Sequence, residues 1–499
     1  MFAEDQVVSL QKMAPGNAPT TRLRFTAIAA LLAVAFVAIA AERTHTLHEV
    51  PNRDVMLYAV IGHELLAGRP LYSDLWDHKP PLIYASYAAV ERLTGYGEQM
   101  FYVLAVVLSC WTAAMIAWSA APFGPAAAFW GVLLWVLAWN AASIEGNEPN
   151  AELFMNALIA TAFGILVTAR TFTAIRASLF GLLIALITLF KPYGLVYGVL
   201  PLVVLSDRQW CVRRNLVAIP LAVAAVWIPL IVYFAATGRT QILVDSLLTF
   251  NSRYAGSMPL NLAVSFLPPF TPAAYMVLVP LLVVAAGSLV SQYRYGGLRT
   301  REWSLLIALI VLTHVSVALP GRFFGHYFQL WLPPLIIAAA WSAASVRIPI
   351  LLIGAGMFLA AVQIRDLRRE PDDWSRQANM RDESPLASRR LGLKLRRQIP
   401  GCEFGLNVGS EVGVYFYGRF RPAAGTFYQS HVDTTPLGDE LYNRIGASQR
   451  YAPCFLTVGK KTINVNERLE HLVPSLVSAQ GFERDERLSD DLFDVYLRR

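Results

Sequence analysis

Long apolar runs recur over about the first three quarters of the chain, and they constrain the fold more than any other feature. The chain has 499 residues, of which 55% are hydrophobic and only 15% are charged. An average soluble domain is about 25% charged, whereas a helix that crosses a bilayer needs roughly 20 mostly apolar residues. The sequence therefore predicts a polytopic, mainly α-helical membrane protein with about eleven transmembrane helices.

The predicted spans are residues 25–42, 100–120, 125–142, 151–168, 177–190, 193–206, 216–236, 271–290, 303–320, 327–345 and 348–364. The first span follows Arg22 and Arg24 and is long for the core of a signal peptide, which favours a retained anchor. The fifth and sixth spans are short. They are compatible with two helices or with one long helix interrupted at Lys191-Pro192.

Arginines in the short loops set the orientation. Loops after every second span are rich in Arg, whereas the outer loops beyond the first are poorer. The positive-inside rule then places residues 1–24 in the cytoplasm, and an odd number of spans places residues 365–499 outside. Because the Arg residues lie at the ends of spans, the net charge of +7 indicates orientation and not a nucleic-acid partner.

Residues 365–499 have the mixed pattern of a small soluble α/β domain. Residues 384–397 predict an amphipathic basic helix, which lies against anionic lipid headgroups or forms an ordinary solvated face. Val412–Phe416, Cys454–Val458 and Leu492–Leu497 predict short strands.

This C-terminal part also holds Cys402 and Cys454. An extracytoplasmic location permits a disulfide between the two residues. Their spacing fits free thiols equally well, because spacing alone does not show proximity.

The first external loop, residues 43–99, is the most polar part of the membrane region. Asn52 predicts an N-cap for an interfacial helix from about Arg53 to Ala67, with Gly68 at its end. Asp54 falls in the first turn of this helix. A carboxylate in that position is a candidate catalytic group, but it also fits simple stabilisation of the helix dipole, which is worth about 0.3–1 kcal/mol.

Pro80 and Pro81 predict the start of a second helix, which would run to about Leu93. Its positive end would point toward His78 and Lys79. Such an arrangement suits a phosphate site, although a lysine at this depth also meets lipid headgroups without specificity.

The later external loops add further charged and aromatic groups. Glu148 and Glu152 lie in or beside the second external loop, and an acid at membrane depth is a candidate for function. Near the outer ends of later spans lie Lys191, Arg253, Arg322, His326 and Tyr327. Together, these cations and carboxylates suit a site that holds an anionic lipid phosphate beside a general base.

Several of these segments resemble a known family. RDVMLYAVIGHELLAG followed by YSDLWDHKPPLIY is similar to the first external loop of bacterial protein-mannosyltransferase-like glycosyltransferases of the C-type membrane fold. Relatives of that family include the dolichyl-phosphate-mannose protein mannosyltransferases and the lipid A aminoarabinose transferase. EPNAELFM and GRFFGHYFQLWLPP also resemble the family, in the expected order. The resemblance covers about residues 20–365 and does not extend to the C-terminal domain.

The resemblance assigns expected roles to single residues. Asp54 matches the aspartate of an acidic pair in the family, although Val55 stands where the glutamate of that pair is often found. Glu152 matches a second acid at the start of the fourth span, and Lys79 matches the lysine of the Lys-Pro-Pro segment. The segment with Arg322 resembles the loop at the lipid-phosphate end of the pocket.

The expected function is an inverting transfer of a sugar from a polyprenyl-phosphate donor to a hydroxyl group of an envelope lipid, glycan or protein, at the outer face of the bacterial inner membrane. The expected catalytic residues are Asp54 and Glu152. The expected donor-phosphate ligands are Lys79, Arg322, His326 and Arg253. The expected substrate contacts are His78, Tyr58, Glu148 and Tyr327.

No cofactor is expected to be required. Some members of the family hold a metal near the site, which here would involve Asp54, Glu152 or His78, but the sequence has no metal-ligand spacing. The main alternative is a lipid or glycolipid transporter, and a non-catalytic scaffold is a third. The absence of an evident internal repeat weakens a transporter built from inverted repeats.

Overall fold

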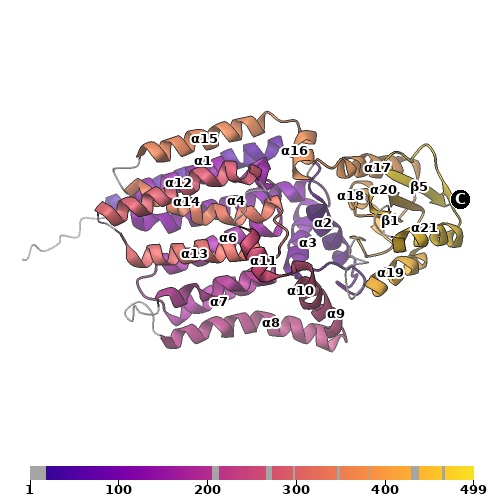
Figure 1. Ribbon diagram of the computed structural model, residues 1–499, viewed down its shortest axis with the longest axis horizontal. Coiled ribbons are helices and arrows are strands. Elements are labelled where there is room, and N and C mark those ends of the chain that lie inside the picture. The colour runs from indigo at the N-terminus through magenta and orange to yellow at the C-terminus, as the bar shows by residue number, and fades with distance from the viewer. Residues whose placement is uncertain are drawn as a thin grey trace, which may run out of the picture.

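The computed structural model describes residues 18–204, 213–265, 272–295, 298–344, 349–379, 381–428, 438–463 and 467–498. A long helical bundle carries a smaller α/β domain at one end, with a group of short helices between the two parts (Figure 1). The predicted fold class is therefore confirmed.

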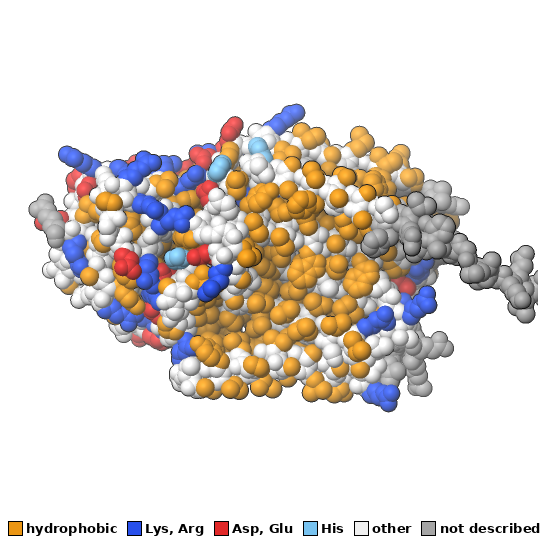
Figure 2. Space-filling view, turned by 180° about the vertical axis from the view of Figure 1, so that it is seen from behind, with side chains coloured by type: hydrophobic (Ala, Val, Ile, Leu, Met, Phe, Trp, Pro, Cys, Tyr) orange, Lys and Arg blue, Asp and Glu red, His pale blue; other side chains and the backbone are white. Residues whose placement is uncertain are grey.

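Each predicted span corresponds to a helical segment of the bundle. These segments are α1 (Ala18–His45), α4 (Gln99–Ala120), α5 (Pro125–Ala138), α6 (Ala151–Val167), α7 (Ala174–Thr188), η3 (Pro192–Val204), α8 (Ala218–Ala236), α12 (Pro272–Tyr295), α13 (Thr300–Ala318), α14 (Leu332–Trp341) and α15 (Pro349–Leu367). Among the described residues, six helices have the length and apolar composition to cross a membrane. Apolar side chains cover the flank of the bundle, and charged side chains gather at its ends (Figure 2). This distribution is that of a multi-pass membrane protein.

The fifth and sixth spans are two separate elements. Helix α7 ends at Thr188 and the 3₁₀ segment η3 begins at Pro192, and the two pack against each other. The turn between them places Lys191 at the same end of the bundle as the C-terminal domain.

Residues 43–99, the predicted first external loop, form α2 (Arg53–Leu66) and α3 (Leu82–Thr94). The Asn52 side chain caps α2 as expected, accepting hydrogen bonds from the backbone N–H groups of Asp54 and Val55. Gly68 follows the helix with a φ of 82°. Burial extends around α2, because the bundle covers one side and the C-terminal domain covers the other. The short helices α9 (Thr240–Val244), α10 (Phe250–Ala255) and α11 (Met258–Val264) lie at the same end of the bundle.

Shorter helical segments complete the membrane region. They are η1 (Ala121–Phe123), η2 (Ala142–Ile144), η4 (Arg213–Val217), η5 (Asp245–Thr249), η7 (Gly325–Trp331) and η8 (Ser342–Ala344). Of these, η2 and η7 contact each other and carry residues of the second and last external loops toward α2.

The C-terminal domain is built on a five-stranded sheet of order β2-β1-β3-β5-β4. Its strands are β1 (Phe404–Val408), β2 (Arg421–Pro422), β3 (Phe455–Gly459), β4 (Phe482–Arg484) and β5 (Phe493–Arg498). Strand β1 is parallel to β2 and β3, whereas β5 is antiparallel to β3 and β4. The helical segments of the domain are α16 (Pro371–Ala378), α17 (Ser384–Gln398), α18 (Gly413–Gly418), α19 (Gly438–Gly446), η10 (Ala447–Tyr451), α20 (Lys460–Ile463) and α21 (Glu467–Gln480).

Two of the three predicted strands are confirmed, as β3 and β5. The expectation of a strand at Val412–Phe416 is wrong, because this segment lies in and beside helix α18. Every residue of α18 is buried, and α17 packs against it. A short apolar run that is buried on all sides has no periodicity to distinguish a helix from a strand.

The basic helix predicted at residues 384–397 is confirmed as α17. It buries Leu386, Leu391 and Leu395 and leaves its arginines on the other faces. A disulfide joins Cys402 to Cys454, with their Cα atoms 5.9 Å apart. The bond links the residues that precede β1 and β3, the two parallel strands at the centre of the sheet.

Candidate active site

A cavity of about 840 Å³ opens at the end of the bundle that carries the C-terminal domain. Its walls come from the start of α2, the loop before α3, the segment at Lys191–Tyr193, the region from η5 to α10 and the loop at 319–327. Glu145 and two residues of the C-terminal part, Asn379 and Tyr428, complete the lining. The fold thus brings together external loops that are far apart in the sequence.

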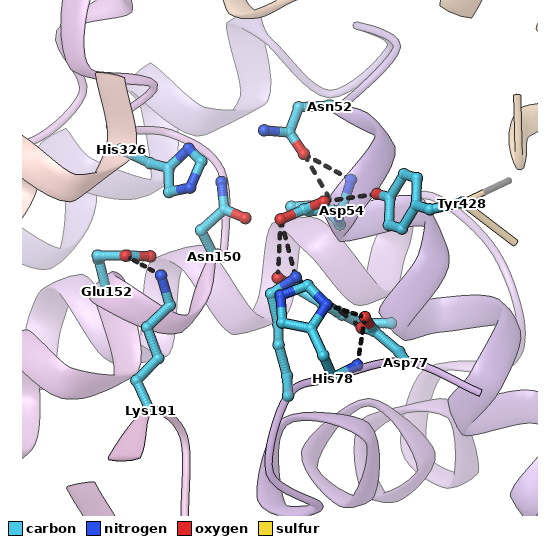
Figure 3. Close-up of polar contacts among 12 residues, drawn as sticks. Asn52, Asp54, Asp77, His78, Asn150, Glu152, Lys191, His326 and Tyr428 are labelled. Carbon is cyan, nitrogen blue, oxygen red and sulfur yellow. Dashed lines mark hydrogen bonds and ion pairs between the residues drawn. The ribbon is translucent and has the colours of Figure 1, made fainter. Parts of the chain in front are cut away.

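Asp54 lies in this cavity at the N-terminal turn of α2, as Figure 3 shows. Its Oδ2 atom is 3.1 Å from Lys79 Nζ and accepts a hydrogen bond of 3.2 Å from Tyr58. Its Oδ1 atom accepts a hydrogen bond of 2.5 Å from the hydroxyl of Tyr428. The Asp54 side chain is still 26% exposed. A substrate in the cavity can therefore reach a carboxylate whose orientation is fixed.

Burial by itself would raise the pKa of Asp54, because it disfavours the anion. The positive charges of Lys79 and His326 and the hydrogen bond from Tyr428 oppose this effect. The net result is a pKa well below the usual range of an aspartate. Asp54 is thus an anion at neutral pH and has the ionisation state that a general base requires.

Lys79 is held between two carboxylates. Its Nζ atom lies 3.8 Å from the buried Asp77, in addition to its contact with Asp54. Asp77 in turn accepts a hydrogen bond of 2.6 Å from Tyr84, and the Tyr72 hydroxyl donates to the backbone carbonyl of Lys79. The two negative charges raise the pKa of Lys79 despite its burial, so the side chain stays a cation.

Glu152 and Lys191 form a second buried ion pair, which Figure 3 shows across the site from Asp54. Glu152 lies in the first turn of α6, is fully buried and does not line the cavity. Lys191 does line the cavity, with its Nζ atom 4.1 Å from the centre of the Tyr327 ring. Glu152 therefore contacts the site through Lys191.

The second external loop holds the start of α2 in place. Glu148 accepts a hydrogen bond of 2.9 Å from the backbone N–H of Asn52, and Glu145 accepts one of 2.9 Å from the Asn52 side chain. His326 Nδ1 lies 2.8 Å from Glu145. Burial and the neighbouring Glu145 and Glu49 raise the pKa of Glu148, which favours its protonated form. Glu148 was predicted to contact the substrate. It is fully buried and does not line the cavity.

His326 lines the cavity beside Glu145. Burial lowers its pKa, but the charges of Glu145 and Glu152 outweigh this effect, and the net pKa is raised. A protonated His326 adds positive charge to the side of the cavity that faces Asp54. Its ring nitrogen Nδ1 is engaged by Glu145, so a hydrogen bond from His326 to a bound anion would come from Nε2.

Arg253 and Arg322 are the exposed cations of the cavity lining. The Arg322 guanidinium lies 4.0 Å from the centre of the Tyr254 ring and donates a hydrogen bond to the Tyr254 carbonyl. Within the described part of the chain, neither arginine forms an ion pair with a carboxylate. They are thus the arginines whose charge remains available to a bound anion.

The predicted substrate contacts occupy different positions. His78 lines the cavity and stacks on Phe250, with 4.7 Å between the ring centres. Tyr327 lines the cavity beside Lys191, whereas Tyr58 is buried behind Asp54. Phe250 lies in a segment that carries no recognisable motif, so nothing in the sequence singled it out.

The sequence also gave no reason to choose Tyr428, because it lies in a domain without a recognised motif. Lys191 was noted only as one of several outer-face cations. Its pairing with Glu152 depends on the turn between α7 and η3, which sequence spacing does not determine. No group of three or more His, Cys, Asp or Glu side chains in the described ranges is arranged to hold a metal ion.

No protein-family model and no curated protein sequence matches the chain. Among solved structures, the crystal structure of ArnT from Cupriavidus metallidurans bound to undecaprenyl phosphate is similar over 96% of this chain and 98% of its own, with 13% identity and a TM-score of 0.63. The structure of the same ArnT in the apo state covers the same shares, with 14% identity and a TM-score of 0.61. At these identities the likeness establishes the fold, and the C-type membrane fold expected from the sequence is confirmed.

Proposed function

We propose that this protein is a membrane glycosyltransferase that moves a sugar from a polyprenyl-phosphate donor to a hydroxyl group of an envelope acceptor, with inversion at the anomeric carbon. One observation carries the proposal. A reachable aspartate anion shares one cavity at the end of a membrane bundle with two exposed arginines, which have no carboxylate partner among the described residues. We place this cavity at the outer face of the bacterial inner membrane, with the N-terminus in the cytoplasm.

The lining of the cavity suits a lipid phosphate. Leu247, Leu248 and Leu319 provide an apolar wall, and Arg253 and Arg322 lie beside it. An isoprenoid chain would contact the leucines, and its phosphate would meet the arginines through charge-assisted hydrogen bonds. The undecaprenyl phosphate bound in ArnT, which has the same fold, supports this class of ligand.

The transfer needs one proton acceptor and one stabilised leaving group. The acceptor hydroxyl gives its proton to Asp54 while its oxygen attacks the anomeric carbon of the donor sugar. The bond between that carbon and the phosphate oxygen breaks, and polyprenyl phosphate leaves with the electron pair. Lys79 and the two arginines stabilise the charge that grows on the phosphate. A single displacement of this kind inverts the anomeric configuration.

Lys79 can serve both halves of this reaction. It stabilises the Asp54 anion when the cavity is free. When a donor phosphate shares Lys79, less of its charge acts on Asp54, and the basicity of the aspartate rises. Donor binding would thus activate the base at the moment when an acceptor is needed.

We assign supporting roles to the remaining residues. Glu152 holds Lys191 at the cavity wall, where it adds positive charge beside Tyr327. His78 and Tyr327 present rings to the cavity and suit contacts with the sugar or the acceptor. Glu148 acts indirectly, since it holds the backbone of Asn52 at the start of α2.

Release of free polyprenyl phosphate tests the proposal. Purified protein in liposomes is incubated with a panel of polyprenyl-phosphate sugars and an extract of envelope acceptors. Wild-type protein should release polyprenyl phosphate and label an acceptor. Movement of an intact donor across the bilayer, with no member of the panel cleaved, would contradict the proposal and favour a transporter. Activity should persist with EDTA, because we propose no required metal.

A further inference from the structure

Among the described residues of the C-terminal domain, Tyr428 contacts Asp54. It lines the same cavity, and its hydroxyl donates a hydrogen bond of 2.5 Å to Asp54 Oδ1. Figure 3 shows it on the opposite side of Asp54 from Glu152 and Lys191. We propose that Tyr428 is a positioning residue for Asp54, so that the C-terminal domain completes the active site. This inference rests on the proposed function of Asp54 as the base.

The backbone next to Tyr428 is tied to the first external loop. Trp76 and Thr426 form a parallel bridge, and the N–H of Trp76 donates a hydrogen bond of 2.8 Å to the carbonyl of Gly425. Gly425 packs so closely against the loop that a Cβ atom there would lie 1.7 Å from the Asp74 carbonyl oxygen. The two segments run in the same direction from the bridge. Lys79 and Tyr428, which follow within three residues, therefore both reach Asp54.

The C-terminal domain also holds both ends of α2. At the start of the helix, Arg53 pairs with Asp382 and lies 2.6 Å from Glu411. Near its end, the buried Glu64 pairs with Arg421 at 2.8 Å. Asp54, which follows Arg53 directly, thus lies in a helix whose position depends on this domain. Because the helix is held in place, a hydrogen bond from Tyr428 can fix the plane of the Asp54 carboxylate.

The surroundings of Asp54 give Tyr428 a distinct role. The ionisable groups that act on Asp54 come from several elements: Tyr58 from α2, Asp77, His78 and Lys79 from the loop before α3, Lys191 from the turn after α7, and His326 from η7. Tyr58 and Lys79 both contact Oδ2, whereas Oδ1 accepts the hydrogen bond from Tyr428. Tyr428 therefore orients the second oxygen by using one lone pair of Oδ1 and leaves the other lone pair of Oδ1 for the acceptor hydroxyl.

Replacement of Tyr428 by phenylalanine removes one hydroxyl and keeps the ring. A hydrogen bond to a charged group is commonly worth a factor of about ten to a hundred, and we expect kcat to fall by about tenfold or more. The donor KM should stay within about twofold, because Tyr428 contacts Asp54 and not the arginines. Loss of the bond also raises the pKa of Asp54. A larger share of the base is then protonated as pH falls, and the deficit in kcat should grow toward acid pH.

Tyr451 offers a matched control. It is also a tyrosine of the C-terminal domain, and it also donates a hydrogen bond, of 3.2 Å, to a carboxylate of the first external loop, Asp74. It does not line the cavity. If Tyr428 served only to dock the domain, Tyr428→Phe and Tyr451→Phe would change kcat equally and would leave the pH profile unchanged. That outcome would overturn the inference.

Two further measurements keep the test decisive. Thermal melting and binding of undecaprenyl phosphate show whether Tyr428→Phe is folded. If it is not, 3-fluorotyrosine is incorporated at position 428, which keeps the shape and strengthens the donor. The acid limb of the kcat profile should then move to lower pH, and an unchanged limb would refute the positioning role. Wild-type protein without any transfer activity would refute the proposed function instead, whereas an active wild type matched by Tyr428→Phe would refute only this inference.

Discussion

Two pairs of a carboxylate and a lysine lie on the two sides of one cavity, and they differ in access. Asp54 is 26% exposed in the cavity beside Lys79 and has hydrogen-bond partners on both oxygens. Glu152 is fully buried behind Lys191, which is the member of its pair that reaches the cavity. The first pair thus presents both of its charges to the cavity, whereas the second presents its cation alone.

The comparison separates chemistry from support. A general base must lie within hydrogen-bond reach of the proton that it removes. Asp54 meets this condition, whereas a fully buried Glu152 does not meet it in this conformation. A buried ion pair contributes little net stability, but loss of one partner leaves an uncompensated charge. Glu152 is therefore better suited to hold Lys191 than to share the role of base.

The largest expected effect is that of Asp54→Asn. The amide keeps the shape of the side chain and removes its basicity, so kcat should fall by about 10²–10⁴-fold, the usual contribution of a general base. Binding of undecaprenyl phosphate should be retained. Release of polyprenyl phosphate measures the first quantity and a lipid-binding titration measures the second. Transfer at the wild-type rate would show that Asp54 is not the base, and the distinction drawn between the two pairs would be wrong.

Lys79→Met should have the next largest effect. It removes the positive charge that stabilises the anions of Asp54 and Asp77, and the pKa of Asp54 should rise. The base is then protonated over a wider range, so the acid limb of kcat/KM should move to higher pH. Activity at neutral pH should fall by about tenfold to a hundredfold.

The pH profile and the donor KM of Lys79→Met separate two roles. A shifted limb with an unchanged donor KM would show that Lys79 mainly tunes Asp54. A raised donor KM with an unchanged limb would show that it mainly binds the phosphate, and the proposed sharing of Lys79 would then be wrong.

Glu152→Gln should affect stability more than chemistry. It leaves the buried Lys191 without its counter-ion, and breaking a buried pair in this way commonly costs about 3–5 kcal/mol. The melting temperature in detergent should therefore drop. The folded fraction should lose less than about tenfold in kcat. A loss as large as that of Asp54→Asn, without a lower melting temperature, would place Glu152 among the catalytic groups.

The smallest effects are expected at the exposed arginines. Arg253→Ala and Arg322→Ala each remove one exposed cation from the cavity lining. Exposed charge pairs are worth about 0–1 kcal/mol, so the donor KM should rise only about twofold to fivefold in each variant, with kcat nearly unchanged. The double variant should show a larger rise. Donor KM values that stay unchanged in all three variants would remove these arginines from the phosphate site.

Some of the site follows directly from local sequence. The cap at Asn52 places Asp54 in the first turn of α2, and the proline pair precedes α3. Hydrogen bonds between near neighbours dictate such features, so they do not depend on the rest of the chain. Other contacts of the site join distant residues. Glu152 pairs with Lys191, 39 positions away, and Tyr428 contacts Asp54, 374 positions away. No local sequence pattern predicts contacts between residues so far apart in the chain.

The wrong prediction of a strand at Val412–Phe416 has a related cause. Its apolar residues fit a buried strand or a buried helix equally well, and packing against α17 decided for the helix. The strands at β3 and β5 were predictable because they are short and rich in branched and aromatic residues.

The sequence by itself determined the membrane bundle, since runs of apolar residues must be removed from water wherever they occur. It also determined the positions of the loops that carry ionisable groups. Only the tertiary structure decided which of these groups meet, which of them a substrate can reach and that the C-terminal domain contributes Tyr428 to the cavity. The physical reason is that burial and charge pairing depend on contacts between distant segments, and these contacts set both the access and the ionisation of each carboxylate.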